Sequence, residues 1–130
     1  MSSVIEPGEP MTNQTRIEQF VPGEAQTAEA LVALLAGAFS DSARYEEQRI
    51  RAELMPAPGP FYRTFFLARR GDTVIGAGGV KAADWASDTH ILYLSAVARP
   101  YRGQGVGKAL IQERINWVRT GFRSGCILVS

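Results

Sequence analysis

Three glycines alternate with other residues in Arg102-Gly103-Gln104-Gly105-Val106-Gly107-Lys108, and a basic residue stands at each end. Glycine leaves the backbone amides open to a ligand, because it has no side chain in front of them. A helix that begins inside such a segment adds N–H groups without intrahelical partners and a partial positive charge. This segment, called the glycine loop below, therefore has the composition of a phosphate-binding site.

Two common phosphate-binding motifs do not fit the spacing of the glycine loop. A dinucleotide fingerprint requires G-x-G-x-x-G followed by an acidic residue, whereas the glycines here run G-x-G-x-G. A P-loop requires G-x-x-x-x-G-K-[ST], but Lys108 is followed by Ala109, which has no hydroxyl for magnesium. The pattern that remains is [RQ]-x-x-G-x-[GA], filled by Arg102, Gly105 and Gly107. A turn whose glycines serve only close packing is the alternative.

A predicted strand and a predicted helix flank the glycine loop. The apolar run Ile91–Val97 is typical of a buried strand, and apolar residues at helical spacing predict a helix over Lys108–Thr120. With this setting, the segment Leu92–Val118 resembles the acetyl-coenzyme A signature of the GNAT superfamily of N-acetyltransferases. The resemblance implies transfer of an acetyl group from acetyl-CoA to a primary amine of a small molecule or a protein.

The resemblance also implies which residues bind acetyl-CoA or CoA. The amides of the glycine loop would hold the pyrophosphate, and backbone groups at the end of the central strand would pair with the pantetheine arm. Ordinary sheet pairing is the alternative for that strand. The implied cofactor-binding residues are Ser95, Ala96, Val97, Arg102, Gly103, Gln104, Gly105, Val106, Gly107 and Lys108.

The acid–base residues are predicted less directly. An unperturbed amine with a pKa of about 10.4 is protonated at neutral pH, so it must lose a proton before it attacks. Some family members use a glutamate on the central strand, where this chain has Ile91. His90, the only histidine, is the predicted base, with a solvated histidine as the alternative. Tyr93, on the same strand face as Ile91, is expected to line the acceptor site or to pack. No metal site is predicted.

The whole chain predicts an α+β domain, a mixed and mostly antiparallel sheet flanked by helices, with the order β-α-α-β-β-β-α-β. The glycines at 76, 78 and 79 indicate a bulge, or else room for a ligand beside the sheet. Cys126–Val129 is expected to be buried on both faces. The expected strands are Gln14–Val21, Phe61–Arg69, Thr73–Lys81, Asp88–Val97 and Gly125–Ser130, and the expected helices are Thr27–Phe39, Ala43–Met55 and Lys108–Thr120, the last closed by Gly121.

Length and composition limit the number of domains and the classes of partner that can be expected. The 130 residues suit one domain over residues 14–130, preceded by a polar, flexible tail over Met1–Asn13. A net charge of +1 gives no reason to expect nucleic acid or a membrane surface as partner. A single cysteine and the absence of a secretory signal predict a cytoplasmic protein.

The GNAT fold implies one more helix and two more strands after the last expected strand of this chain. The alternative to an active enzyme is therefore a catalytically incomplete CoA-binding module, or a fragment that needs a partner chain. The exposed edge of an apolar terminal strand would also template pairing with another chain, which predicts either a homodimer through that strand or a marginally stable chain that tends to aggregate.

Overall fold

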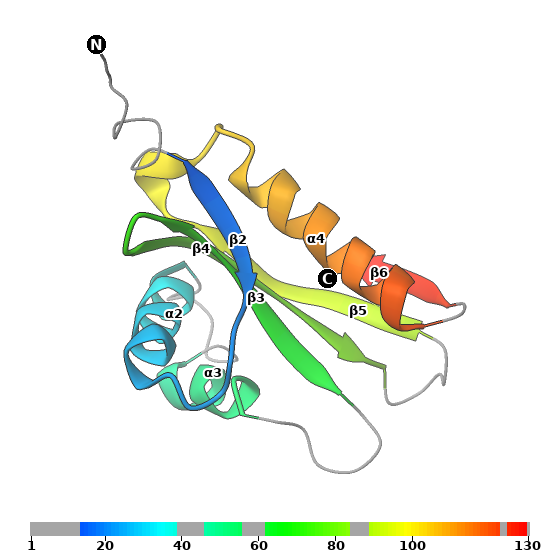
Figure 1. Ribbon diagram of the computed structural model, residues 1–130. Coiled ribbons are helices and arrows are strands. Elements are labelled where there is room, and N and C mark those ends of the chain that lie inside the picture. The colour runs from blue at the N-terminus through cyan, green and yellow to red at the C-terminus, as the bar shows by residue number, and fades with distance from the viewer. Residues whose placement is uncertain (1–13, 39–45, 56–61, 84–88, 123–124, 130) are drawn as a thin grey trace.

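The computed structural model describes residues 14–38, 46–55, 62–83, 89–122 and 125–129 (Figure 1). The predicted N-terminal tail, residues 1–13, lies outside this part of the chain. The elements follow the expected order β-α-α-β-β-β-α-β. They are β2 (Thr15–Gln19), α2 (Ala25–Ala38), α3 (Glu47–Glu53), β3 (Arg63–Arg70), β4 (Thr73–Ala82), β5 (Thr89–Val97), α4 (Val106–Gly121) and β6 (Cys126–Val129), and a 3-10 turn at Arg99–Tyr101 connects β5 to the segment before α4.

The strands form one five-stranded sheet in the order β2-β3-β4-β5-β6. The first three pairings are antiparallel, and β6 joins β5 in parallel. A tight turn links β3 to β4, where Gly71 has a φ of 62° that side chains rarely adopt. The predicted mixed, mostly antiparallel sheet is confirmed.

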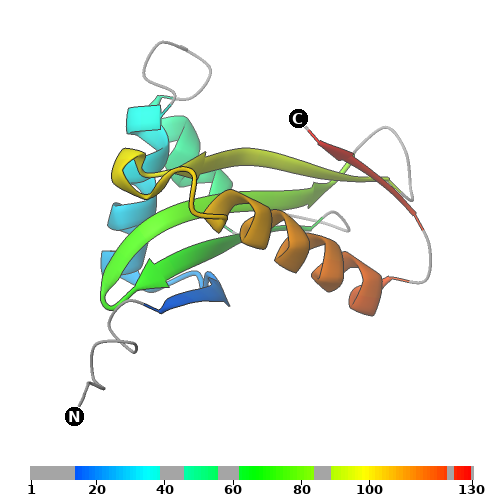
Figure 2. The ribbon, with the colours of Figure 1, turned by 90° about the horizontal axis from the view of Figure 1, so that it is seen from above.

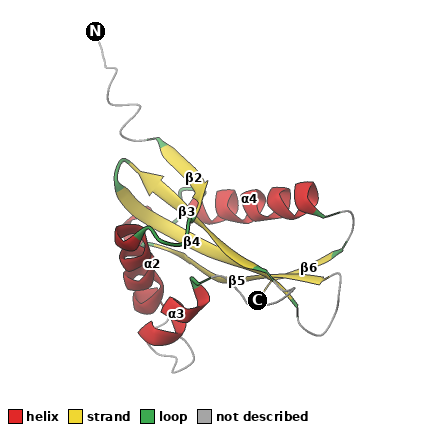
Figure 3. Ribbon diagram, turned by 60° about the horizontal axis from the view of Figure 1, so that its bottom comes forward, coloured by secondary structure: helices red, strands yellow, loops and turns green. Residues whose placement is uncertain are grey.

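Helices α2 and α3 cover one face of the sheet, and α4 covers the other (Figure 3). Neighbouring residues of a strand point to opposite faces, so Phe65 packs under α2 and α3 while Phe66 packs under α4. Leu31, Leu35 and Ile50 complete the first core and are fully buried. The sheet therefore separates two apolar cores.

Helix α4 starts two residues earlier than expected and extends one residue further. Val106, Leu110 and Val118 face the sheet at helical spacing, as predicted. Gly121 is the last helical residue, not the residue after the helix. Phe122 caps the helix, and its N–H donates to Val118 O.

A β-bulge interrupts the pairing of β4 with β5. Ala77 pairs with Ala96 and Gly79 pairs with Tyr93, so Gly78 faces two residues of β5. Leu94 lies in this extra stretch with a φ of 50°. The bulge predicted from the glycines of β4 is confirmed.

Strand β6 differs from its expected burial. Cys126, Leu128 and Val129 are exposed, the last two to 45% and 71%, whereas burial on both faces was predicted. The reason lies in the packing, because only Ile127 reaches the core under α4. The homodimer through β6 stays a prediction.

Two classes of feature are absent from the described residues. They hold no cluster of three or more side chains suited to bind a metal ion. None of the helices in this part of the chain is long and apolar enough to cross a membrane.

Candidate functional site

The glycine loop adopts a backbone conformation that requires its glycines. Gly103 and Gly105 have φ angles of 78° and 85°, and a Cβ at either position would meet no atom within 4 Å. Ala109 N–H donates to Gly105 O at 3.0 Å, which closes the first turn of α4. The amides of residues 106–108 therefore have no partner in the helix.

The side chains of the glycine loop hold it against the end of β5. Arg102 Nε donates to Val97 O at 2.8 Å, and Gln104 Nε2 lies 3.4 Å from Pro100 O. Arg102 and Lys108 are both exposed. The loop thus presents free amides with one positive charge before them and one after them.

Arg70, the last residue of β3, contacts the glycine loop through its side chain. Its NH2 donates to Gln104 Oε1 at 3.2 Å and to Thr15 Oγ1 at 3.0 Å. The guanidinium carbon lies 5.2 Å from the ring centre of Tyr101, in cation–π range. Sequence reasoning missed Arg70, because nothing in the sequence indicates that β3 ends beneath the loop.

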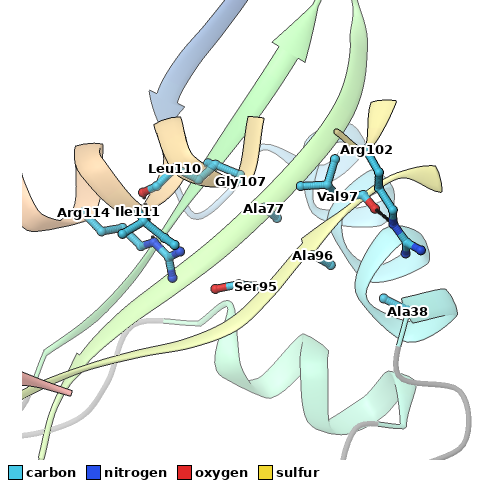
Figure 4. Close-up of a pocket in the computed structure, with 10 residues that line it drawn as sticks. All are labelled: Ala38, Ala77, Ser95, Ala96, Val97, Arg102, Gly107, Leu110, Ile111 and Arg114. Atoms are coloured by element: carbon cyan, nitrogen blue, oxygen red, sulfur yellow. Dashed lines mark hydrogen bonds between the residues drawn. The ribbon is translucent and has the colours of Figure 1, made fainter. Parts of the chain in front are cut away.

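A cavity of about 420 Å³ opens beside the glycine loop (Figure 4). Figure 4 shows side chains from α4, β5 and the end of α2 around it. Most of them are apolar. The lining residues are Ala38, Ala77, Ser95, Ala96, Val97, Arg102, Gly107, Leu110, Ile111 and Arg114.

The edge of β5 forms one side of this cavity. The β5–β6 ladder ends where Leu92 meets Val129, so within the described residues β6 runs beside only the first part of β5 (Figure 2). Ala98 N–H donates to Ile75 O of β4 at 2.7 Å. Because peptide groups alternate along a strand, those of Val97 point away from β4, toward the open edge.

The structure therefore brings two sequence-predicted groups of residues together. Ser95, Ala96 and Val97 line the same cavity as Arg102 and Gly107. They meet because the strand, the 3-10 turn and the helix return the chain on itself over a short distance. The arrangement offers amides for an anion at one end and a strand edge along one side.

Arg114 is a site residue that sequence reasoning missed. It is completely buried and continues the stripe of Val106, Leu110 and Val118 on α4. The signal was present, because position 114 lies in that stripe at helical spacing and carries a cation. Its burial lowers the pKa of the guanidinium to about 10.

His90 lies away from the cavity. Only 3% of its surface is exposed, and Nδ1 lies 2.6 Å from the hydroxyl of Tyr62. Its ring packs 4.5 Å from that of Phe122, centre to centre. The alternative of a solvated histidine is wrong, because aromatic rings enclose the side chain. Its role as the base stays a prediction.

Tyr93 lies on the opposite face of β5 from His90, toward α2 and α3. Its hydroxyl donates to Glu53 Oε1 at 2.5 Å, and Lys81 Nζ stands 4.4 Å from its ring centre. Burial, and then the bond to Glu53, raise the pKa of Tyr93 well above its usual value. The structure does not bring the two predicted acid–base residues together, and the role of Tyr93 also stays a prediction.

The sequence and the fold of the chain both resemble those of known proteins. The sequence profile of the acetyltransferase (GNAT) family matches residues 28–129. The chain belongs to the GNAT family of acetyltransferases. The match runs from within α2 to the end of β6 and includes the glycine loop.

Solved GNAT structures have the same fold. A tandem GNAT protein from the clavulanic acid biosynthesis pathway superposes with a TM-score of 0.70 at 21% identity, covering 82% of this chain and 34% of its own. An aminoglycoside acetyltransferase from an uncultured soil sample, in complex with sisomicin, gives 0.66 at 17% identity, with 89% and 76% covered. An aminoglycoside 6'-N-acetyltransferase complexed with coenzyme A gives 0.67 at 16% identity, with 81% and 56% covered.

These likenesses establish the GNAT fold and no particular substrate, because the identities are low. The chain spans about a third of the length of the tandem protein. No curated protein sequence matches it.

Proposed function

We propose that this chain is an N-acetyltransferase that moves an acetyl group from acetyl-CoA to a primary amine of a small molecule or a protein. The observation that carries the proposal is the glycine loop at one end of a cavity that follows the open edge of β5. Membership of the GNAT family supports the reaction type.

The glycine loop fits the pyrophosphate of coenzyme A. The unpartnered amides of residues 106–108 and the dipole of α4 both attract an anion. The absence of side chains at Gly103 and Gly105 lets a phosphate approach the backbone. Arg102 and Lys108 are exposed and add two full positive charges.

The strand edge fits the pantetheine arm, which carries amide groups in an extended chain. Such a chain pairs with the free edge of a sheet as a peptide does. Val97 turns its peptide groups toward that edge, and its carbonyl already accepts one hydrogen bond, from Arg102. Ala96 pairs with Ala77 in β4, which holds the edge in position.

Bound acetyl-CoA would supply an activated thioester carbonyl. The amine nitrogen forms the new C–N bond at that carbonyl carbon, the C–S bond breaks, and the proton that leaves the amine balances the charge of the thiolate. A free amide on the β5 edge would polarise the carbonyl oxygen. Tyr93 is protonated at neutral pH and donates to Glu53, and its raised pKa makes the hydroxyl a weaker acid than that of a free tyrosine.

The acceptor is proposed only as a class, a primary amine. Two of the similar structures are described as aminoglycoside acetyltransferases, which supports including polyamine sugars among the amines to be tried. The proton of the amine would pass either to His90 or to solvent in the cavity.

Gly105→Asp tests the proposal. The new carboxylate would lie against the phosphates, and the left-handed backbone would be strained. Calorimetry should show that CoA binds the wild type and that this variant loses at least about tenfold in affinity. Gly23→Asp is the matched control, because Gly23 also has a positive φ and open space but lies in the turn before α2.

Thiol release from acetyl-CoA with a panel of amines, sisomicin included, tests the reaction itself. Release that depends on an added amine supports the enzyme. Tight CoA binding without release would instead support the CoA-binding module. Unchanged CoA affinity in Gly105→Asp would show that the loop is not the binding site.

A further inference from the structure

The guanidinium of Arg114 lies in surroundings that normally hold an apolar side chain. Its neighbours in the buried stripe of α4 are Val106, Leu110 and Val118. A Cβ on Gly78 would lie only 2.6 Å from Cζ of Arg114, so the guanidinium rests directly on the bare backbone of β4 at the bulge. Replacing that glycine with any other residue would displace the guanidinium.

The charge of Arg114 has no counter-charge in the described part of the chain. Nε donates to Leu110 O at 3.1 Å, and the first terminal nitrogen donates to Gly79 O at 2.9 Å. The ion pairs among described residues involve Arg51, Arg63 and Arg69, and not Arg114. A buried charge is unfavourable unless an opposite charge or enough hydrogen bonds accompany it. At pH 7 the guanidinium is still protonated, so the missing partner is an anion.

The position of Arg114 shows where that anion would come from. Arg114 lines the cavity, which has Arg102 and Gly107 at its loop end (Figure 4). Arg114 lies seven positions after Gly107, which is roughly 10 Å along the helix axis. One cation therefore stands at the outer end of the cavity and another at the inner end, with mostly apolar side chains between them.

We propose that Arg114 binds a carboxylate at the far end of the acyl group, so that the preferred donor is the CoA thioester of a short dicarboxylic acid. This inference rests on the proposed function and extends its donor beyond acetyl-CoA. A carboxylate suits the guanidinium because the two form parallel N–H···O bonds. With the pyrophosphate at the glycine loop, the acyl end of the ligand is the part that reaches the inner end of the cavity.

The competing explanation is that Arg114 only holds the carbonyl of Gly79 at the bulge. That role would make the arginine important for folding but indifferent to the acyl group. The two explanations separate in a binding experiment with two thioesters of equal chain length, succinyl-CoA and butyryl-CoA. Only the first of these carries a terminal carboxylate.

Calorimetry with wild type, Arg114→Met and Arg119→Met tests the proposal, with unacylated CoA as the reference ligand. Arg119 is exposed on the same helix and is the matched control. We expect wild type and Arg119→Met to bind succinyl-CoA about tenfold more tightly than butyryl-CoA. Arg114→Met should bind the two thioesters within about twofold of each other.

Gly78→Ala provides a second test should Arg114→Met fail to fold. The new methyl group displaces the guanidinium without removing the charge, so the preference for succinyl-CoA should fall. Equal affinity of the wild type for the two thioesters, with CoA binding intact, would overturn this inference and leave the proposed function standing. If neither CoA nor any thioester binds, the proposed function itself fails and the inference fails with it.

Discussion

Arg70 NH2 lies 3.2 Å from Gln104 Oε1, and this contact ties the last residue of β3 to the middle of the glycine loop. The Nε of Arg70 is buried and has no partner among the described residues. The guanidinium also lies over the ring of Tyr101, which precedes the loop. Arg70 therefore holds in place a loop whose own ligand-binding groups are backbone amides.

Removing this support should weaken CoA binding. We expect Gln104→Ala and Arg70→Leu each to lower the affinity about three- to tenfold, the effect of one charge-assisted hydrogen bond. The double variant should lose less than the sum of the two, because both changes remove the same contact. Calorimetry measures these values, and Gln112→Ala, an exposed change on α4, is the control. Strict additivity would show that the two residues act separately.

His90→Phe distinguishes two roles for His90, a general base in the reaction and a buried residue that only packs in the core. Phenylalanine preserves the aromatic packing against Tyr62 and Phe122 but cannot accept a proton. Because His90 is buried and does not line the cavity, we expect the rate of thiol release to stay within about threefold of wild type. Loss of a general base lowers rates by about 10²–10⁴-fold. A drop of that size in a folded variant would assign the base to His90.

Tyr62 should make the free energy of unfolding depend on pH in the alkaline range. Burial raises its pKa to about 12 from 10.0. Between these values the unfolded chain loses the phenol proton first, so this stabilising effect is complete below pH 10 and is lost as pH rises toward 12.

Tyr62→Phe should remove this pH dependence. At pH 8 the variant should be about 1 kcal/mol less stable, since the contact with His90 is lost. The difference from wild type should shrink above pH 10. Urea unfolding at pH 8 and pH 11 measures both values, and the raised pKa of Tyr93 affects the two proteins alike. A constant difference would contradict the prediction.

Gly79 is required by packing. A Cβ there would lie 2.7 Å from Tyr93 Cε1 and 2.9 Å from two ring atoms of Phe65, both in the core. We expect Gly79→Ala to lower the free energy of unfolding by about 1–3 kcal/mol. Gly37→Ala, in α2 with open space around it, should raise it by about 0.5–1 kcal/mol. Urea unfolding of both variants provides the measurement, and equal stabilities would count against this account.

Local patterns were enough to predict the elements and the glycine loop. Helical spacing in α4, the turn at Gly71 and the apolar run of β5 each depend on residues close in sequence. The bulge was predicted for a similar reason, because the glycines of β4 can hardly pack in a regular strand.

Features that depend on distant residues were not predicted. Arg114 owes its burial to the bare backbone of Gly78, and the stripe of α4 alone does not reveal such a neighbour. His90 is buried by Tyr62 and Phe122, which come from separate parts of the chain. The exposure of β6 depends on what packs over it, which the apolar run Cys126–Val129 does not encode.

The bulge at Leu94 also changes which face of the sheet each later residue of β5 occupies. Before it, even-numbered Leu92 packs under α4; after it, odd-numbered Val97 does so. Tyr93 and Leu94, although adjacent, both pack toward α2 and α3. Deleting Leu94 would restore regular alternation, with Tyr93 and Ala96 still toward α2 and α3 and Val97 still toward α4. The single extra residue therefore joins two halves of β5 that alternate in opposite registers, so the loss of one residue at the bulge should keep the faces of the strand, whereas the loss of one residue elsewhere in β5 should exchange them.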